Sequence, residues 1–392
     1  MTASVPVLIV GAGPVGLSAA LALSKVGIEV RVVDAADGVD RRMRASTFHP
    51  PTLDIIESFG LDEKLASLGL KAEYFQLRQH ETAQAVEFDL FAIRGETHHP
   101  YRLQVEQHHF CDLAVASLRE RGIDVAFGVR VNGLSQNDDK VTVETSDGPI
   151  HATWAVGADG ATSAVRKALR LDYGGMTYTH SSVLVSTPFE FHNALPDISD
   201  VTYCWSDRGP FSLLRQRKFW RASLYPGVED LDEAADEDRV RDWLGYIHPD
   251  ARDADILDVN PYRVHERCVE QFRVGRVFLA GDAAHLNPPS GGMGMNGGIH
   301  DATNLSAKLL AVINGAHHSL LDRYHRQRHT IVTQRIIPQA SANRGRMGVE
   351  NRENQLELLR RYREIANDDE RCREFLLRTS MITGLREASQ IE

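Results

Sequence analysis

A glycine-rich turn near the start of the chain constrains the fold more than any other feature. Residues 5–10 form an apolar run, residues 11–16 read GAGPVG, and apolar residues then recur at helical spacing up to Gly27. A second predicted strand, 28–33, ends at Asp34. This order predicts a β-α-β unit whose glycines lie at the turn from strand to helix, where the pyrophosphate of a dinucleotide can bind.

The residues of this unit have separate predicted roles. Gly11 permits the tight turn, Gly13 lets the backbone approach a pyrophosphate, and Gly16 lets the helix pack on the strand. Asp34 follows Gly16 by 18 residues, a position from which a carboxylate accepts a hydrogen bond from a ribose hydroxyl. The negative charge suits the unphosphorylated ribose of FAD or NAD. A surface aspartate that ends a strand is the alternative.

A second turn from strand to helix follows at residues 157–163, which read GADGATS. Ser163 is a predicted helix cap, and Arg166 lies one turn inside that helix. The Asp159 carboxylate and the Arg166 guanidinium are therefore expected beside each other at the carboxyl end of a strand, where clefts form in open α/β sheets. A simple turn with a capped helix is the alternative.

The third motif is residues 275–285, GRVFLAGDAAH, followed by a loop rich in glycine. Five glycines fall within eight residues, at Gly291, Gly292, Gly294, Gly297 and Gly298. So many residues without a side chain make sense if the backbone lies against a flat ligand. The loop amides and the start of the next helix would favour a group that becomes anionic, as a reduced flavin does. A flexible surface loop is the alternative.

The remaining pattern divides the chain into four predicted parts. Residues 1–175 form the first part of a Rossmann-like FAD-binding domain, and 176–265 form an inserted mixed β-sheet domain that binds substrate. Residues 266–330 return to the FAD-binding domain. The segment 331–392 is predicted to be helical and to pack on the body or on a partner chain. The expected class is thus α/β, or α+β overall.

Composition narrows the class of ligand. The 392 residues include 54 acidic and 44 basic side chains, and the net charge of -10 argues against nucleic acid and favours a small molecule. No leader and no apolar run of membrane-spanning length is visible, so we expect a cytoplasmic protein without a membrane segment. No metal site is expected, because the four cysteines are widely separated and predicted to be reduced; they are Cys111, Cys204, Cys268 and Cys372.

Together the three motifs resemble those of the FAD-dependent aromatic hydroxylases, single-component flavoprotein monooxygenases with the para-hydroxybenzoate hydroxylase fold. The likeness spans residues 5–329. It implies FAD as cofactor, NADH or NADPH as reductant without a second Rossmann unit, and O2 as co-substrate. The implied reaction hydroxylates a small phenolic or N-heteroaromatic ring through a flavin C4a-hydroperoxide. A homodimer is compatible with the resemblance.

The resemblance also implies which residues contact the cofactor. Gly11, Gly13, Gly16 and Asp34 would hold its ADP half. Asp159 and Arg166 would serve both FAD and the pyridine nucleotide, Asp282 would contact the ribityl chain, and Pro288 would begin the wall beside the isoalloxazine. The other implied contacts are Arg44, Gln104, Gly292, Gly294, Met295 and Asn296.

A group that assists proton removal from the substrate is expected near the ring, because a phenol is more nucleophilic as an anion. Pro288 lies beside the expected reaction site. The other candidates by position are Tyr203, Arg215, Tyr225 and His49, for each of which a packing or surface role is the alternative.

Two other functions are compatible with this fold. One is a different flavin-dependent oxidoreductase. A halogenase is disfavoured, because its W-x-W-x-I-P segment is absent and the four tryptophans are widely separated, and no Baeyer–Villiger signature is visible. The other is a non-catalytic FAD-binding module that assembles with a partner through the C-terminal helices. No motif specifies the aromatic substrate.

Overall fold

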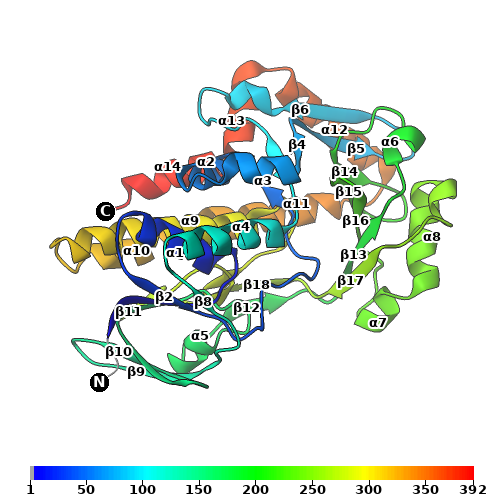
Figure 1. Ribbon diagram of the computed structural model, residues 1–392. Helices are drawn as coiled ribbons and strands as arrows, with labels where there is room; N and C mark the ends of the chain where they lie inside the picture. Colours follow the sequence, from blue (N-terminus) through cyan, green and yellow to red (C-terminus); the bar gives the residue numbers. More distant parts are fainter. Residues whose placement is uncertain (1–3) are drawn as a thin grey trace.

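The computed structural model describes residues 4–392 and places all three motifs at one edge of a parallel sheet (Figure 1). At its centre β1 (Val5–Val10) lies between β2 (Val30–Val33) and β11 (Gly148–Gly157), and all three run parallel. The order β19-β20-β11-β1-β2-β8 is completed by β19 (Arg273–Val274), β20 (Val277–Leu279) and β8 (Val125–Ala126). An antiparallel extension on β11 consists of β9 (Val131–Gln136) and β10 (Val141–Thr145).

A layer of helices packs beside this sheet. The helix α1 (Pro14–Lys25) packs between α4 (Gln107–Glu120) and the long helix α9 (Met293–Ile313), and α10 (Leu320–Ile331) packs on α9. The contact between α1 and α9 is close, because a Cβ on Gly298 would lie 2.6 Å from Val15 Cγ2. The apolar sides of these helices and of the strands form one continuous buried core.

A second sheet of seven strands stands at the other side of the molecule, in the order β17-β13-β16-β15-β14-β5-β6. Its strands are β5 (Tyr74–Gln79), β6 (Ala85–Asp89), β13 (Ser182–Thr187), β14 (Val201–Trp205), β15 (Phe211–Arg215), β16 (Trp220–Leu224) and β17 (Asp258–Tyr262). The helices α7 (Leu231–Ala234) and α8 (Glu237–Ile247) belong to its outer layer, as Figure 1 shows for α8.

This sheet differs from the sequence prediction in one respect. Residues 74–89 fall within the segment assigned to the FAD-binding domain, yet β5 pairs in parallel with β14 and completes the second sheet. Pairing between strands so distant in sequence leaves no local pattern.

Two three-stranded sheets connect the larger ones. One has the order β12-β18-β21 and contains Gly174–Thr177, His265–Cys268 and His285–Leu286. The other has the order β3-β7-β4 and contains Thr47–Phe48, Arg102–Gln104 and Leu70–Ala72. Smaller helices between the sheets are α2 (Pro50–Ser58), α3 (Asp62–Leu68), α5 (Ala164–Ala168) and α6 (Phe191–Ala194).

The C-terminal segment packs on the body of the protein. After α10 a π-helical turn, Val332–Ile336, leads into α11 (Ile337–Met347), α12 (Arg352–Ala366), α13 (Asp369–Thr379) and α14 (Ile382–Gln390). The helix α12 lies on β5 and β6, and the Phe375 ring of α13 lies 4.6 Å from that of Phe88. The prediction that the segment 331–392 is helical is therefore confirmed, and α12 and α13 complete a small core with the second sheet.

One element boundary shifts from its predicted position, since the strand predicted over residues 28–33 begins at Val30. The four cysteines are free, as expected. Within residues 4–392, no helix is both long and apolar enough to span a bilayer.

Candidate active site

A cavity of about 1240 Å³ extends from the start of α1 to the seven-stranded sheet. This volume exceeds the range of about 300–1000 Å³ that is usual for a pocket holding one small ligand. One end is lined by the glycine-rich turns of the parallel sheet, and the other by side chains of β5, β14, β15 and β16 and of the C-terminal helices. The cavity therefore has room for a dinucleotide together with a small second molecule.

The three glycines of the first turn divide their roles. Gly11 has a φ of +109°, and a Cβ there would lie 2.3 Å from the carbonyl oxygen of Ala158. A Cβ on Gly16 would lie 1.9 Å from the carbonyl oxygen of Gly11, and Gly16 does not line the cavity. At Gly13, which lines the cavity, nothing lies within 4 Å of the Cβ position. Gly11 and Gly16 thus permit close packing, and Gly13 keeps the backbone open to a ligand at the N-terminus of α1.

Asp34 lines the cavity and also holds the glycine turn. Its carboxylate accepts hydrogen bonds from the amides of Ala12, at 2.6 Å, and Ala36, at 2.8 Å. A carboxylate has further lone pairs, so these contacts leave it able to accept from a ribose hydroxyl.

Asp159 holds its own turn, and Arg166 connects that turn to the one after β20. The Asp159 carboxylate accepts from Ser163 Oγ at 2.5 Å and from the amide of Ala164 at 2.7 Å, and burial raises its pKa. Ser163 caps α5, as predicted. The Arg166 guanidinium donates to the carbonyl oxygens of Ala161 and Ala283. Asp159 lines the cavity and Arg166 lies behind the wall, so the contact of Arg166 with the cofactor stays a prediction.

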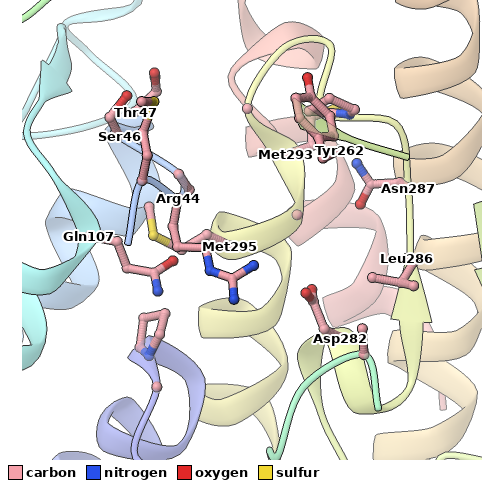
Figure 2. Close-up of a pocket in the computed structure, with 18 of the residues that line it drawn as sticks. Arg44, Ser46, Thr47, Gln107, Tyr262, Asp282, Leu286, Asn287, Met293 and Met295 are labelled. Carbon is pink, nitrogen blue, oxygen red and sulfur yellow. The ribbon is translucent and has the colours of Figure 1, made fainter. Parts of the chain in front are cut away.

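Arg44 and Gln107 lie on one side of the cavity and Asp282 on the other (Figure 2). Gln107 replaces the predicted Gln104, which is fully buried in β7 and accepts a hydrogen bond from Thr47 Oγ1 at 3.0 Å. The resemblance implied Gln104, whereas Gln107, three residues further along the chain, is the first residue of α4.

Asp282 opens onto the cavity from the short turn after β20. Burial raises the pKa of its carboxyl group, and the nearby His285 and Arg44 partly offset this effect. Behind the turn, the Asp301 carboxylate accepts from the amide of Gly281 at 3.0 Å and pairs with Arg328 at 2.6 Å. Burial alone would raise the pKa of Asp301, but Arg328 and His285 outweigh it and lower the pKa to about 2. A buried ion pair therefore fixes the turn that carries Asp282.

The glycine loop lines the cavity and leads into α9. Gly291 and Gly292 have φ values of +96° and +67°, which suit glycine, and Gly292 is the N-cap of α9. The cavity wall here consists of Pro289, Ser290, Gly291, Gly292, Met293, Gly294 and Met295. The positive end of a 21-residue helix thus faces the cavity.

Two residues predicted in this wall lie behind it. Pro288 is buried and does not line the cavity, whereas Pro289 does. The Asn296 side chain accepts from the amide of His49 at 2.9 Å and donates to the carbonyl oxygens of Thr47 and Gly292. Asn296 therefore supports the loop and does not line the cavity.

His49 is also a support of the loop. Its ring is fully buried, and Nε2 lies 2.7 Å from the carbonyl oxygen of Gly291. Burial, aided by the charge of Arg102, lowers the pKa of His49 to about 3. The ring is therefore neutral and donates to Gly291, and since it does not line the cavity it is not placed to accept a proton from a substrate.

This histidine predicts a loss of stability in acid. Because the pKa is about 3 in the folded protein and ordinarily 6.5, the unfolded chain binds the proton first as the pH falls. The contribution is complete above pH 6.5, and below it the free energy of unfolding falls by up to about 1.4 kcal/mol per pH unit. In urea titrations between pH 7 and 4.5, His49→Gln is expected to show a shallower decline than the unmodified protein. The control is His317→Gln, which removes an exposed histidine and should leave the decline unchanged. If the free energy of unfolding of His49→Gln falls with pH as steeply as that of the unmodified protein, the assignment is wrong.

The far end of the cavity, formed by β5, β14, β15, β16 and the C-terminal helices, is largely aromatic, and we call it the aromatic chamber. Tyr203 and Tyr225 line it, as predicted by position, and burial raises the pKa of Tyr225. Arg215 does not line it, because its partly exposed guanidinium turns toward Asp200, 3.4 Å away. No sequence pattern pointed to Arg102 or Tyr262, or to the lining residues of the C-terminal helices, which are Asn343, Arg346, Met347, Tyr362, Phe375 and Thr379.

Similarity to known proteins agrees with this geometry. A family described as FAD binding domain matches residues 4–337. Para-nitrophenol 4-monooxygenase of Pseudomonas sp. (strain WBC-3) is 32% identical over 97% of this chain and 96% of its own length. The 6-hydroxy-3-succinoylpyridine 3-monooxygenase of Pseudomonas putida (strain DSM 28022 / S16) is 29% identical over 86% and 87%.

A solved structure extends the comparison to the fold. The crystal structure of p-nitrophenol 4-monooxygenase from Pseudomonas putida DLL-E4 has a TM-score of 0.90, with 30% identity over 96% of this chain and 98% of that one. Together with the cavity between glycine-rich turns and an aromatic chamber, these similarities show that the chain belongs to the FAD-binding family and is an FAD-dependent aromatic hydroxylase, a flavoprotein monooxygenase.

Proposed function

We propose that this protein hydroxylates a small phenolic or N-heteroaromatic compound, that NADH or NADPH is its reductant, and that one chain carries out both halves of the reaction. The observation that carries the proposal is the single cavity that joins the glycine-rich turns to the aromatic chamber. The names of the relatives, which refer to a nitrophenol and a hydroxypyridine, support a substrate of this size.

Residues along the cavity would contact successive parts of FAD. The turn at Gly13 and the N-terminus of α1 would bind the pyrophosphate, and Asp34 would accept from the adenosine ribose. Arg44, Gln107 and Asp282 would hold the middle of the cofactor between the two walls (Figure 2). When bound, FAD supplies the acceptance of hydride and the activation of oxygen.

The loop before α9 would stabilise charge at the flavin ring. The amide of Gly294 and the N-terminus of α9 lie at the cavity wall, where they would favour negative charge on a reduced flavin, whereas the amide of Gly292 donates to the carbonyl oxygen of Pro289. His49 and Asn296 keep this loop in place from behind.

Tyr203 is the proposed hydrogen-bond donor to the substrate oxygen. Its hydroxyl lies 3.4 Å from Arg102 Nη1 and accepts from it, which leaves its own proton free to point toward a ligand in the chamber. Apolar walls on either side, including Phe75 and Phe211, would exclude bulk water.

The proposal is tested by following NADH and NADPH oxidation by the purified protein, alone and with a panel of hydroxylated aromatics and N-heterocycles. Faster oxidation with at least one compound, and a product heavier by one oxygen atom, is the expected result. If neither nucleotide is oxidised with any compound although FAD is bound, the proposed reductant and the one-chain reaction are wrong.

Asp282 provides a separate test of the cofactor site. Asp282→Ala is expected to weaken FAD binding roughly 10- to 150-fold, the worth of hydrogen bonds to a charged group. Titration of the apoprotein with FAD, followed by quenching of flavin fluorescence, measures the change. Asp253→Ala removes an exposed carboxylate outside the cavity and serves as the control. Equal affinity in the two variants would remove Asp282 from the site.

A further inference from the structure

Arg102 is a buried cation at the wall of the aromatic chamber. It lies in β7, is 3% exposed and lines the cavity. Its guanidinium lies over the Phe75 ring, 4.2 Å from the ring centre. Within residues 4–392 no carboxylate pairs with it, its Nε has no hydrogen-bond partner, and its one polar contact is the Tyr203 hydroxyl at 3.4 Å.

Other buried arginines of this protein have firmer partners. Arg221 pairs with Glu106 and donates to the carbonyl oxygen of Arg44, and Arg328 pairs with Asp301. Arg78 forms no ion pair among the described residues, but it donates to the carbonyl oxygen of Pro196 at 3.0 Å and does not line the cavity. Among these arginines, only Arg102 both lacks a firm hydrogen-bond partner and lines the aromatic chamber.

An unpaired buried guanidinium is costly. Burial lowers the pKa of Arg102, yet an arginine side chain keeps its proton in proteins, so the charge persists. Removing such a charge from water without an anion nearby costs several kcal/mol. A residue that destabilises the free protein in this way is explained if a ligand supplies the missing anion.

The distribution of charge along the cavity also favours an anionic ligand near Arg102. The carboxylates that line it are Asp34, Asp40, Asp159 and Asp282, all on the loops of the parallel sheet. The described lining of the aromatic chamber includes no carboxylate, but it includes Arg102 and Arg346, and Arg346 is bonded to the Tyr362 hydroxyl and Asn343. The chamber is therefore electropositive.

We propose that Arg102 binds a negatively charged oxygen of the aromatic substrate, so that the protein selects aromatic anions, either phenolates or carboxylates, over neutral rings. The Tyr203 hydroxyl would donate a second hydrogen bond to the same group. This inference rests on the proposed function, because it concerns the substrate of that reaction. A phenolate held by a guanidinium would enter the chamber already ionised.

The preference is measured first on the unmodified, FAD-loaded protein. Three probes are titrated and followed by the change in flavin absorption and by calorimetry: 4-nitrophenol, 4-hydroxybenzoate and the neutral 4-nitroanisole. We expect at least one of the two acidic probes to bind about 10-fold or more tightly than 4-nitroanisole. If the phenolate is the bound group, the affinity of 4-nitrophenol rises with its ionised fraction as the pH increases. If the carboxylate is the bound group, the affinity of 4-hydroxybenzoate stays constant across neutral pH. Equal affinity for all three probes, or no binding by either acid, overturns the proposal.

Variants then assign the preference to Arg102. Arg102→Met is expected to weaken binding of the preferred anion roughly 10- to 150-fold, as for loss of a hydrogen bond to a charged group, and to change the affinity for 4-nitroanisole by less than about twofold. Arg102→Lys keeps a point charge and should restore part of the loss. The matched control is Arg78→Met, which removes a buried guanidinium outside the cavity and should keep the full preference for anions. Equal losses for neutral and anionic probes in Arg102→Met, or the same loss of preference in Arg78→Met, overturn the proposal.

Stability gives an independent readout that a structural arginine would not share. Because Arg102→Met removes an uncompensated charge, the thermal midpoint of the substrate-free variant is expected to stay the same or rise. A clear fall, with FAD content unchanged, would assign Arg102 a structural role. These binding measurements need neither reductant nor turnover. Absence of turnover with a preserved preference for anions would therefore defeat the proposed function alone, and hydroxylation with equal binding of neutral rings would defeat this inference alone.

Discussion

Gly13→Ala is expected to give a folded protein that no longer retains FAD. The added methyl group meets no protein atom within 4 Å, so the apoprotein is not strained, but it occupies the surface at which the backbone would approach the pyrophosphate. The flavin content of the purified variant, from the ratio of flavin to protein absorbance, should fall close to zero, while its circular dichroism and thermal midpoint match those of the apoprotein.

Gly16→Ala should have the opposite signature. Its methyl group would lie 1.9 Å from the carbonyl oxygen of Gly11, so α1 must move away from β1. We expect a loss of more than about 3 kcal/mol in the free energy of unfolding, at the upper end of the cost of overpacking. Normal flavin content in Gly13→Ala, or unchanged stability in Gly16→Ala, would contradict the division of roles among the glycines.

Arg328→Met is expected to lower the free energy of unfolding by about 3–5 kcal/mol, because it leaves Asp301 charged and buried. Both side chains are at most 1% exposed. The Asp301 carboxylate also accepts a hydrogen bond from the amide of Gly281, the residue that precedes Asp282. Urea unfolding measures the loss, and FAD affinity should fall with it, since the turn that carries Asp282 loses its support.

Two further variants separate the ion pair from general packing. Asp301→Asn combined with Arg328→Met removes the uncompensated charge and should recover part of the stability. Arg335→Met breaks the exposed pair with Glu387 and should cost less than about 1 kcal/mol. If Arg328→Met were as mild as Arg335→Met, the buried pair would not be the support of the turn.

The sequence was most informative where a local pattern has one structural solution. An apolar strand, a glycine turn and a helix predicted the centre of the parallel sheet, and the predicted helix cap at Ser163 was confirmed. An error of a few residues in sequence can place a side chain in a different part of the structure. Gln104 and Gln107 are three residues apart, yet a change from strand to helix between them turns one into the core and the other into the cavity.

Other features were not predictable from a local pattern. The pairing of β5 with β14 depends on the approach of segments more than a hundred residues apart, and no periodicity encodes it. Arg102 was overlooked for a different reason, since a single arginine in a mixed segment usually indicates a solvated surface. Only the packing of β7 against the second sheet shows that this guanidinium is buried and has no carboxylate partner among the described residues.

The chamber wall is built from both ends of the chain, with Phe88 of β6 against Phe375 of α13 and with Tyr362 and Thr379 at the cavity. During synthesis the turns around Gly13, Asp159 and Asp282 emerge before these helices do, so the nucleotide half can be assembled while the aromatic half still lacks a side. Contacts between segments so far apart in sequence form slowly. We therefore expect the aromatic half of the cavity to be completed last, when the C-terminal helices dock on the second sheet.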